Sequence, residues 1–317
     1  MEQVIDISNL TVSFQDNGNL LTAIEDIQLG IRTGETLVVI GESGSGKSVL
    51  GLSILRLLPD TALISGSILF KGKKLLTMSE SEIESIRGSM IAWIPQNPKT
   101  GFNPSMKMWK QIAEPSVIHS GLSWSEARKQ AIQQLGLYNI DPAALWADKY
   151  PVTYSGGMLQ RAMVAMGTST NPEVIIADEP TKGIDIINKI AIFEMFADLK
   201  RKGITLVLIT HDLDLAAELA DRIVVMYCGQ IIEVSGKNQF FHNPRHPYSR
   251  GLINSLPQNG LNPIPGSAPP MQMRLTGCRF RERCFEQREQ CTSNIPLISL
   301  VDDRVRCIQY NSRNQAG

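Results

Sequence analysis

One short stretch has residue types and a spacing suited to holding phosphate: Gly41-Glu42-Ser43-Gly44-Ser45-Gly46-Lys47-Ser48. Glycines let a loop close around an anion, so that backbone N–H groups and the start of the next helix face it. In such a loop Lys47 reaches the β- and γ-phosphates, and the Ser48 hydroxyl binds Mg²⁺. The alternative, a Gly/Ser-rich turn with an accidental lysine, is disfavoured because the apolar run TLVVI precedes the stretch and apolar residues at helical spacing follow it. We expect a nucleotide here, bound by Gly41, Ser43, Gly44, Ser45, Gly46, Lys47 and Ser48.

Two carboxylates end a second apolar run, in Val174-Ile175-Ile176-Ala177-Asp178-Glu179. If this run is a strand that ends beside the glycine-rich loop, Asp178 supports the magnesium shell. Glu179 then polarises a water in line with the γ-phosphate. The alternative is a strand that ends in a solvated acidic pair. It is disfavoured because the apolar run is uninterrupted and Pro180-Thr181 stops it at once.

These residues need a scaffold whose strands end beside one another. Near the N-terminus the short β-like pieces VIDI, LTVSF and AIEDIQLGI alternate, and GSILFKGKKLL predicts an antiparallel piece that returns to them. The segment KSVLGLSILRLL predicts a helix that stops at Pro59. The runs VIIA, TLVLIT and RIVVMY are separated by helical stretches, which predicts βαβ units. The fold class is therefore α/β, with a mainly parallel sheet and an antiparallel β subdomain.

Two further regions differ from this scaffold in their sequence pattern and composition. Residues from about 99 to 160 predict helices broken by Gly and Pro, including one that Ser123 and Glu126 begin as a capping box and Gly136 ends. After about residue 250 the composition shifts to Asn, Pro and Gly, as in a linker, and leads to a cysteine-bearing tail. We expect a nucleotide-binding domain at 1–250, with its helical subdomain at about 99–160, and an extension at 251–317.

A third motif lies between the loop and the acidic strand, Tyr154-Ser155-Gly156-Gly157-Met158. It resembles the LSGGQ signature of the ATP-binding subunits of ABC transporters, with Tyr for Leu and Met for Gln but with the Ser-Gly-Gly core kept. Other positions of that family follow in the same order over roughly residues 1–250. They are Phe14 as the aromatic that stacks on adenine, Gln96 as the Q-loop glutamine, Asp185 as the D-loop aspartate and His211 as the switch histidine.

The resemblance implies a P-loop ATPase core and a role for each position. The Ser155-Gly156-Gly157 turn would open a helix and offer N–H groups to a nucleotide held by a second subunit. Gln96 would contact Mg²⁺ and the membrane partner, and His211 would hold the γ-phosphate. Taken alone, His211 is more often a structural histidine and Phe14 more often a core residue. The ordered set of motifs favours the functional roles.

One subgroup of the family fits best. Asn243-Pro244-Arg245-His246-Pro247-Tyr248 resembles the HPY segment of subunits that energise oligopeptide, dipeptide and nickel importers. The region from Arg87 to Pro104 and the long cysteine-bearing tail also resemble that subgroup. The segment Thr181-Lys182-Gly183-Ile184-Asp185 departs from the usual Thr-Thr-Ala-Leu-Asp. Because the aspartate is kept, we expect a different contact across the dimer and no loss of hydrolysis.

The tail holds four of the five cysteines, Cys278, Cys284, Cys291 and Cys307. Five, six and fifteen residues separate them, so no CxxC pair is present. Similar subunits imply a [4Fe–4S] cluster, with structural zinc or unliganded thiols as alternatives. Nearby arginines are expected to lower the thiol pKa values, and they are Arg274, Arg279, Arg281, Arg283 and Arg288. We expect the tail to bury little core and its cysteines to stabilise it, and Cys228 to be a small buried residue.

Charge and hydropathy bound the location and partners. Lys and Arg number 31, as do Asp and Glu, so no basic field recruits nucleic acid. The start MEQVIDISNL lacks signal-peptide features, and no apolar run approaches the roughly 20 residues that span a bilayer. We expect a peripheral ATPase on the cytoplasmic face of the bacterial inner membrane. Its partners would be a second ATP-binding subunit, two membrane-spanning permease subunits and, indirectly, an extracytoplasmic substrate-binding protein.

The predicted function is hydrolysis of ATP, with Mg²⁺, to energise import of peptides, nickel or a metal chelate; antimicrobial peptides also remain open. A soluble ABC ATPase acting on nucleic acid or ribosomes is the alternative. Such proteins usually carry two cassettes in one chain, or a long coiled-coil or basic insertion, and this sequence has neither. A regulatory subunit that binds ATP without hydrolysing it is disfavoured because Glu179 and His211 are both present.

Overall fold

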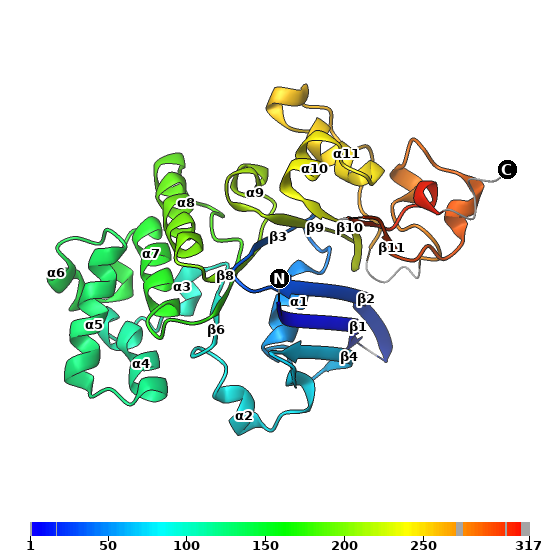
Figure 1. The fold of residues 1–317 in the computed structure, drawn as a ribbon. Coiled ribbons are helices and arrows are strands. Elements are labelled where there is room, and N and C mark those ends of the chain that lie inside the picture. The colour runs from blue at the N-terminus through cyan, green and yellow to red at the C-terminus, as the bar shows by residue number, and fades with distance from the viewer. Residues whose placement is uncertain (1, 17, 271–274, 302, 312–317) are drawn as a thin grey trace. The chain divides into compact units, whose positions relative to one another are not determined.

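The computed structural model describes residues 2–16, 18–270, 275–301 and 303–311. The described residues form two compact units (Figure 1). The first unit takes in residues 1–32, 37–76 and 211–317, and the second takes in residues 33–36 and 77–210. Within the described ranges, no helix has the length and apolar character that crossing a membrane requires.

An antiparallel sheet opens the first unit. Strand β1 (Gln3–Asp16) pairs with β2 (Asn19–Arg32) on one side and with β4 (Ala62–Phe70) on the other, and β5 (Lys73–Lys74) follows β4. Val12 faces Ile24 across one ladder, and Ile5 faces Phe70 across the other, with all four side chains buried. The β4 pairing confirms the antiparallel return predicted from the sequence. A short 3₁₀ turn, Leu75–Thr77, begins at the end of this region.

The strands that carry the glycine-rich loop also belong to the first unit. Strand β3 (Thr36–Ile40) pairs parallel with β9 (Arg222–Tyr227), and β9 turns back into antiparallel β10 (Gln230–Gly236). Helices of this unit are α1 (Lys47–Ile54), α9 (Leu213–Leu219), α10 (Lys237–His242) and α11 (Pro247–Asn254). All five residues of β3 are buried, as its uninterrupted apolar run predicts.

Helix α1 ends at Ile54, earlier than the expected stop at Pro59. Arg56 adopts a left-handed backbone with φ 51°, which an α-helix cannot continue through. The N–H of Leu57 instead donates to the Leu52 carbonyl at 3.0 Å and closes the end of the helix. Beyond Ile54, Leu55 is still buried, but Leu57 is exposed.

The tail folds onto the first unit, so the expectation that it buries little core is wrong. Strand β12 (Arg304–Val305) pairs with β10, and β11 (Ile298–Ser299) pairs with β12. Phe280 is 1% exposed, and Cys291, Ile295 and Ile308 form a small core of their own against which Cys278 packs. The tail also contains four short 3₁₀ turns among its described residues, at Pro257–Asn259, Arg281–Arg283, Glu289–Thr292 and Ile308–Tyr310.

The second unit contains a parallel three-stranded array. Strands β6 (Ile91–Ile94), β7 (Val174–Asp178) and β8 (Thr205–Ile209) run with β7 in the middle. Every residue of β7 and β8 is buried, which explains their continuous apolar sequences. In register, Ile94 faces Ala177 and Asp178 faces Ile209, so the carboxyl ends of β6, β7 and β8 lie at one edge.

Seven helices of the second unit fall within the part of the chain that the structure describes. They are α2 (Glu80–Glu84), α3 (Pro98–Gly101), α4 (Met108–Ser120), α5 (Trp124–Leu137), α6 (Ala143–Ala147), α7 (Gly156–Gly167) and α8 (Ile186–Arg201). Helices α4, α5, α6 and α7 pack together, as the green part of Figure 1 shows. The Ser123–Glu126 capping box is confirmed: the Glu126 N–H donates to Ser123 Oγ, and Glu126 accepts from the Ser123 N–H. The helix ends at Leu137, one residue beyond the expected Gly136.

Candidate nucleotide-binding site

The glycine-rich loop connects β3 to α1 in the first unit, as the sequence predicts. Gly41 has φ 154° and Gly46 has φ 96°, a region that other residues rarely adopt. A Cβ at Gly41 would collide with the carbonyl oxygen of Met226, and one at Gly46 would collide with Ile24. Only glycine fits at these two positions, and the loop can therefore stay closely wound at the start of α1.

Lys47 folds back over this loop. Its Nζ donates to the carbonyls of Gly41, at 2.8 Å, and of Glu42, at 2.9 Å, and the residue is 7% exposed. Ser43 and Gly44 at the apex are exposed, and Ser48 is half-buried in the first turn of α1. The buried Ser45 hydroxyl has no hydrogen-bond partner in the described structure. Polar groups thus gather around a loop that is open at its tip, the arrangement that binding an anion requires.

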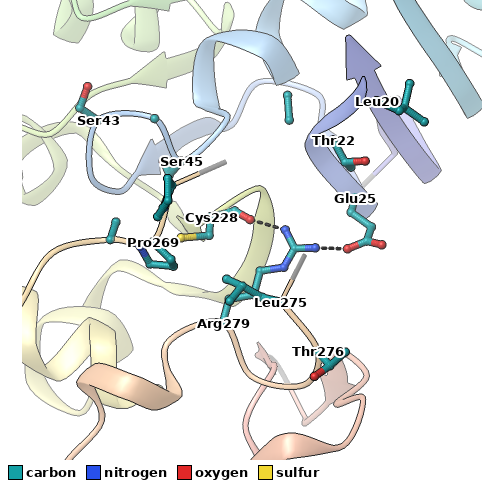
Figure 2. Close-up of a pocket in the computed structure, with 14 residues that line it drawn as sticks. Leu20, Thr22, Glu25, Ser43, Ser45, Cys228, Pro269, Leu275, Thr276 and Arg279 are labelled. Carbon is teal, nitrogen blue, oxygen red and sulfur yellow. Dashed lines mark hydrogen bonds and ion pairs between the residues drawn. The ribbon is translucent and has the colours of Figure 1, made fainter. Parts of the chain in front are cut away.

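A pocket of about 570 Å³ lies beside the loop (Figure 2). Figure 2 shows Ser43 and Ser45 on one side of it and Leu20 and Thr22 of β2 on the other. Tail residues line the remainder, with the Arg279 guanidinium hydrogen-bonded to the Cys228 carbonyl and paired with Glu25. Its lining is Leu20, Thr22, Ala23, Glu25, Ser43, Gly44, Ser45, Cys228, Ala268, Pro269, Pro270, Leu275, Thr276 and Arg279. The tail's part in this wall was not expected from the sequence.

Two further candidates belong to the first unit. Phe14 is half-buried on β1, where it faces Leu21 and Ala62, and it is not among the residues that line the pocket. His211 is exposed just before Asp212, whose carboxylate accepts the N–H groups of Asp214 and Leu215 and begins α9. His211 is therefore an exposed residue directly before the N-cap of a helix. Its role at a γ-phosphate stays a prediction.

The carboxylates and Gln96 share one edge of the second unit. Asp178 is the last residue of β7, Glu179 follows it, and Gln96 follows the neighbouring strand β6 after a single residue. Asp178 is 5% and Glu179 is 9% exposed. Glu179 has φ 48°, and its N–H donates to the Ile209 carbonyl at 2.7 Å. A non-glycine residue held in this uncommon conformation is a frequent feature of functional sites, because the surroundings must stabilise it.

The signature motif opens helix α7 in the second unit. The Ser155 hydroxyl accepts the Met158 N–H at 3.3 Å, and Ser155 and Gly156 are exposed. Tyr154, where the family has Leu, is buried and donates its hydroxyl to the Trp146 carbonyl at 2.7 Å. Burial also raises the pKa of Tyr154. The departure from Leu therefore anchors the start of the helix and leaves the Ser-Gly turn accessible to an anion.

A bridge that the sequence did not reveal joins the signature helix to Asp185. The Arg161 guanidinium of α7 donates to Asn188 Oδ1 at 2.9 Å, and Asn188 Nδ2 donates to Asp185 Oδ2 at 2.7 Å. Asp185 also caps α8 by accepting the Asn188 N–H at 3.0 Å. The spacing of Asp185 and Asn188 is that of a helix cap, the only signal that could have indicated it. The predicted D-loop aspartate is thus fixed at exposed Asp185 in the second unit.

Two parts of the sequence match known families. Residues 24–182 match the family described as ABC transporter, and residues 232–291 match the one described as oligopeptide/dipeptide transporter, C-terminal region. The chain belongs to the ABC transporter family. This confirms the resemblance drawn from the motifs and the α/β fold class with an ABC ATPase core.

Relatives of this ABC protein match nearly its whole length. The dipeptide transport ATP-binding protein DppD of Bacillus subtilis (strain 168) is 38% identical over 311 residues, 96% of this chain and 93% of that protein. The oligopeptide transport ATP-binding protein AppD of the same organism is 37% identical over 320 residues, 98% of each chain. Among solved structures, the dimeric bacterial ABC transporter cassette MJ0796 superposes with a TM-score of 0.66 at 25% identity, covering 74% of this chain and 98% of that one.

Within the first unit of this ABC protein, the HPY segment is hydrogen-bonded to the glycine-rich loop. His246 is the cap of α11, and its Nδ1 accepts the Tyr248 N–H at 3.0 Å. The buried Glu233 carboxylate accepts the N–H groups of Arg245, at 2.9 Å, and His246, at 2.7 Å. Burial lowers the pKa of His246 to about 3, so the ring is neutral near pH 7. The Tyr248 hydroxyl then accepts the Glu42 N–H of the loop at 3.0 Å.

The four tail cysteines form no disulfide, and Cys278 and Cys291 pack in a small apolar cluster. Cys291 and Cys307 are buried, Cys278 and Cys284 are half-buried, and Cys278 donates its N–H to the Cys291 carbonyl at 2.8 Å. Burial raises the pKa of Cys278 to about 12, and the nearby thiols add to that shift. Burial also raises the pKa values of Cys284 and Cys307. In the described ranges, no three His, Cys, Asp or Glu side chains are arranged to hold a metal ion.

The expectation of lowered thiol pKa values is wrong for Cys278, Cys284 and Cys307, because burial outweighs the opposing effect that Arg250 has on Cys284 and Cys307. Arg279 pairs with Glu25, Arg283 with Glu42, and Arg281 donates to the Thr276 carbonyl. These three guanidinium groups are hydrogen-bonded to carboxylates and a carbonyl, whereas burial raises the pKa values of the thiols. Arg274 lies outside the described residues. Cys228 is half-buried at the turn between β9 and β10 with φ 44°, and it lines the pocket.

Proposed function

We propose that this chain is the subunit that binds and hydrolyses ATP in a transporter that imports peptides. The observation that carries the proposal is the match over nearly the whole chain to proteins named for dipeptide and oligopeptide transport. The match of residues 232–291 to the peptide-transporter C-terminal region supports it, because those residues include the HPY segment that contacts the glycine-rich loop. Nickel, a metal chelate and antimicrobial peptides are the alternative cargoes.

The test is reconstitution with the permease subunits that co-purify with this chain and with a peptide-binding protein. ATP should drive uptake of a labelled dipeptide into vesicles, and a labelled nickel salt should not accumulate. Accumulation of nickel in place of the dipeptide would reassign the cargo. Purification of the tagged chain should bring down permease subunits. Recovery of ribosomes or DNA in their place would favour the nucleic-acid alternative, which none of the comparisons supports.

The glycine-rich loop fits a triphosphate and Mg²⁺. Its apex is exposed, the buried Ser45 hydroxyl has no described partner, and the glycines at 41 and 46 leave no space for a side chain. In the proposed complex, Lys47 turns from the Gly41 and Glu42 carbonyls to phosphate oxygens. Ser48, Asp178 and Gln96 would hold the metal ion, which supplies charge neutralisation for phosphoryl transfer.

Hydrolysis is assigned to residues that carry or transfer charge at the γ-phosphate. Glu179 would accept a proton from the attacking water, and His211 would donate a hydrogen bond to the γ-phosphate. Phe14 would stack on adenine. Because phosphoryl transfer needs mainly positioning and charge stabilisation, these groups suffice for the chemistry.

We further propose that ATP closes a dimer in which the Ser155-Gly156-Gly157 turn of one subunit meets the nucleotide of the other, with Asp185 at the contact. The exposed Ser155 and Gly156 at the start of α7 support this, as does the dimeric state that the name of the MJ0796 cassette structure gives. The second subunit can be identical or different. The pair would dock on two permease subunits at the cytoplasmic face of the bacterial inner membrane, supplied indirectly by an extracytoplasmic binding protein.

We propose that the nucleotide-binding domain is residues 1–250, with its helical part at about 99–160, and that an extension at 251–317 follows it. The cysteines of the extension are proposed to stabilise it. The alternatives are a [4Fe–4S] cluster, zinc and free thiols. The four thiols influence one another electrostatically, but their arrangement does not match a metal site and no reaction step is assigned to one. Iron, sulfide and zinc content of anaerobically purified protein, with its absorption spectrum, decides among the three.

A further inference from the structure

Arg283 of the tail contacts the glycine-rich loop in a way that the proposed chemistry does not use. Its side chain is 8% exposed, and Nη1 donates to Glu42 Oε2 at 3.0 Å and to the Tyr227 hydroxyl at 3.1 Å. Its Nε donates to the Pro265 carbonyl at 2.8 Å. Glu42 is the second residue of the loop 41–48, so a residue 241 positions away in the sequence is joined directly to the phosphate-binding segment.

Arg283 packs against two rings of a buried cluster of three aromatic residues. Tyr227 lies 4.8 Å from Tyr248 and 5.4 Å from Phe280, and Tyr248 lies 5.3 Å from Phe280, measured between ring centroids. The guanidinium lies 5.8 Å from the centroids of both Tyr227 and Phe280. All three rings are almost fully buried. A guanidinium stacked in this way has lost most of its rotamer freedom, so its hydrogen bonds have a fixed direction.

Glu42 is therefore held at two points. Its carboxylate accepts from Arg283, and its N–H donates to the Tyr248 hydroxyl at 3.0 Å. The Glu42 carbonyl accepts from Lys47, and the Ser45 N–H donates to the same carbonyl at 3.2 Å. One residue thus links the tail and the HPY segment to the lysine that would reach the phosphates. Movement of Glu42 would move both Lys47 and the N–H groups that follow.

We propose that Arg283 is a positioning residue that keeps the glycine-rich loop in its phosphate-binding conformation through Glu42. The inference rests on the proposed binding of ATP to this loop. A loop ordered in advance binds its ligand more tightly, because binding does not have to supply the cost of ordering it. The tail extension thereby acts on nucleotide affinity through Glu42.

The test compares Arg283→Gln with Arg281→Gln. Arg281 belongs to the same 3₁₀ turn, but its guanidinium donates to the Thr276 carbonyl and not to the loop. Binding of the magnesium complex of a non-hydrolysable ATP analogue should weaken about tenfold in R283Q, the loss expected for one hydrogen bond to a charged group. R281Q should bind as the wild type does. The KM for ATP should rise with R283Q, while kcat at saturating ATP stays within about twofold of the wild type.

Glu42→Gln gives an independent test through the other partner, whose side chain is 31% exposed and whose loss threatens folding less. E42Q should weaken analogue binding as R283Q does, and the double variant should be no weaker than either single one, because both remove the same interaction. If R283Q does not fold, E42Q against wild type decides. Unchanged analogue binding in the folded variants overturns the inference. So does a double variant whose loss of binding equals the sum of the losses in R283Q and E42Q. Failure of the wild type itself to bind the analogue would instead overturn the proposed function.

Discussion

Glu179 is the residue on which the proposed hydrolysis depends most. Glu179→Gln keeps the size of the side chain and the N–H that donates to Ile209, but the amide cannot accept a proton. We expect ATP binding to persist and turnover to fall by about 10²–10⁴-fold. Phosphate release and equilibrium binding of ATP measure the two quantities separately.

The matched control is Glu173→Gln, because Glu173 is exposed and immediately precedes the same strand, β7, at its opposite end. That variant should hydrolyse ATP at the wild-type rate. Equal rates for E179Q and the wild type would refute the assignment of the base. A loss of ATP binding in E179Q would mean that the carboxylate holds the magnesium ion.

Single residues were predictable where their chemistry is local in sequence. The eight-residue loop and the acidic end of β7 could be found because each motif lies within one short stretch, and the structure places both in the expected strand and loop context. Glu42 as a point of contact could not be found, because Arg283 and Tyr248 reach it from more than 200 positions away. The expected direction of the thiol pKa shifts was wrong for the same reason, because the burial that raises the pKa of Cys278 exists only in the folded tail.

At the scale of elements, the start of α7 carries the next prediction. A Cβ at Gly157 would lie 2.5 Å from Asn188 Oδ1, and Asn188 is already held by Arg161 and Asp185. Gly157→Ala should therefore break that bridge and lower the free energy of unfolding by about 1–3 kcal/mol. Thermal or denaturant unfolding measures the change.

Gly156→Ala is the paired variant, because no atom lies within 4 Å of a Cβ at that position. Alanine is the better helix former by about 1 kcal/mol or less, so G156A should match or slightly exceed the wild type in stability. Equal stabilities for G156A and G157A would show that Asn188 can move without cost, and the bridge would then have no structural role.

Elements were predicted better by type than by length. The apolar run of β3 and the periodicity after it gave a strand and a helix, but α1 ends at Ile54 where Arg56 takes a left-handed backbone. Nothing in the apolar pattern marks that turn, because Leu55, Leu57 and Leu58 continue the hydrophobic sequence up to Pro59. The Ser123 capping box was predictable because both of its partners lie within four residues.

For the chain as a whole, the sequence separated the tail from the nucleotide-binding domain at about residue 250, and that division stays a prediction. Within the first unit, β12 contributes only two residues to the ladder with β10, too few for any periodicity to reveal. The tail also contacts that unit through single side chains, such as the Arg306 guanidinium on the Ile231 carbonyl at 3.1 Å. Contacts of this kind depend on the folded arrangement and leave no local pattern.

Phe280 tests whether the tail and the glycine-rich loop behave as one cooperative part of the first unit. Phe280 is 1% exposed against Tyr227 and Tyr248, whereas Phe285, in the same tail, is 67% exposed. Removing the buried ring should cost about 3–5 kcal/mol and leave a cavity beside Tyr248, which accepts the Glu42 N–H. In Phe280→Ala we expect faster amide hydrogen exchange at residues 41–48 as well as in the tail. Phe285→Ala should change stability by no more than about 0.5 kcal/mol and leave loop exchange unaltered. Faster exchange confined to the tail of F280A would mean that the tail opens independently of the loop.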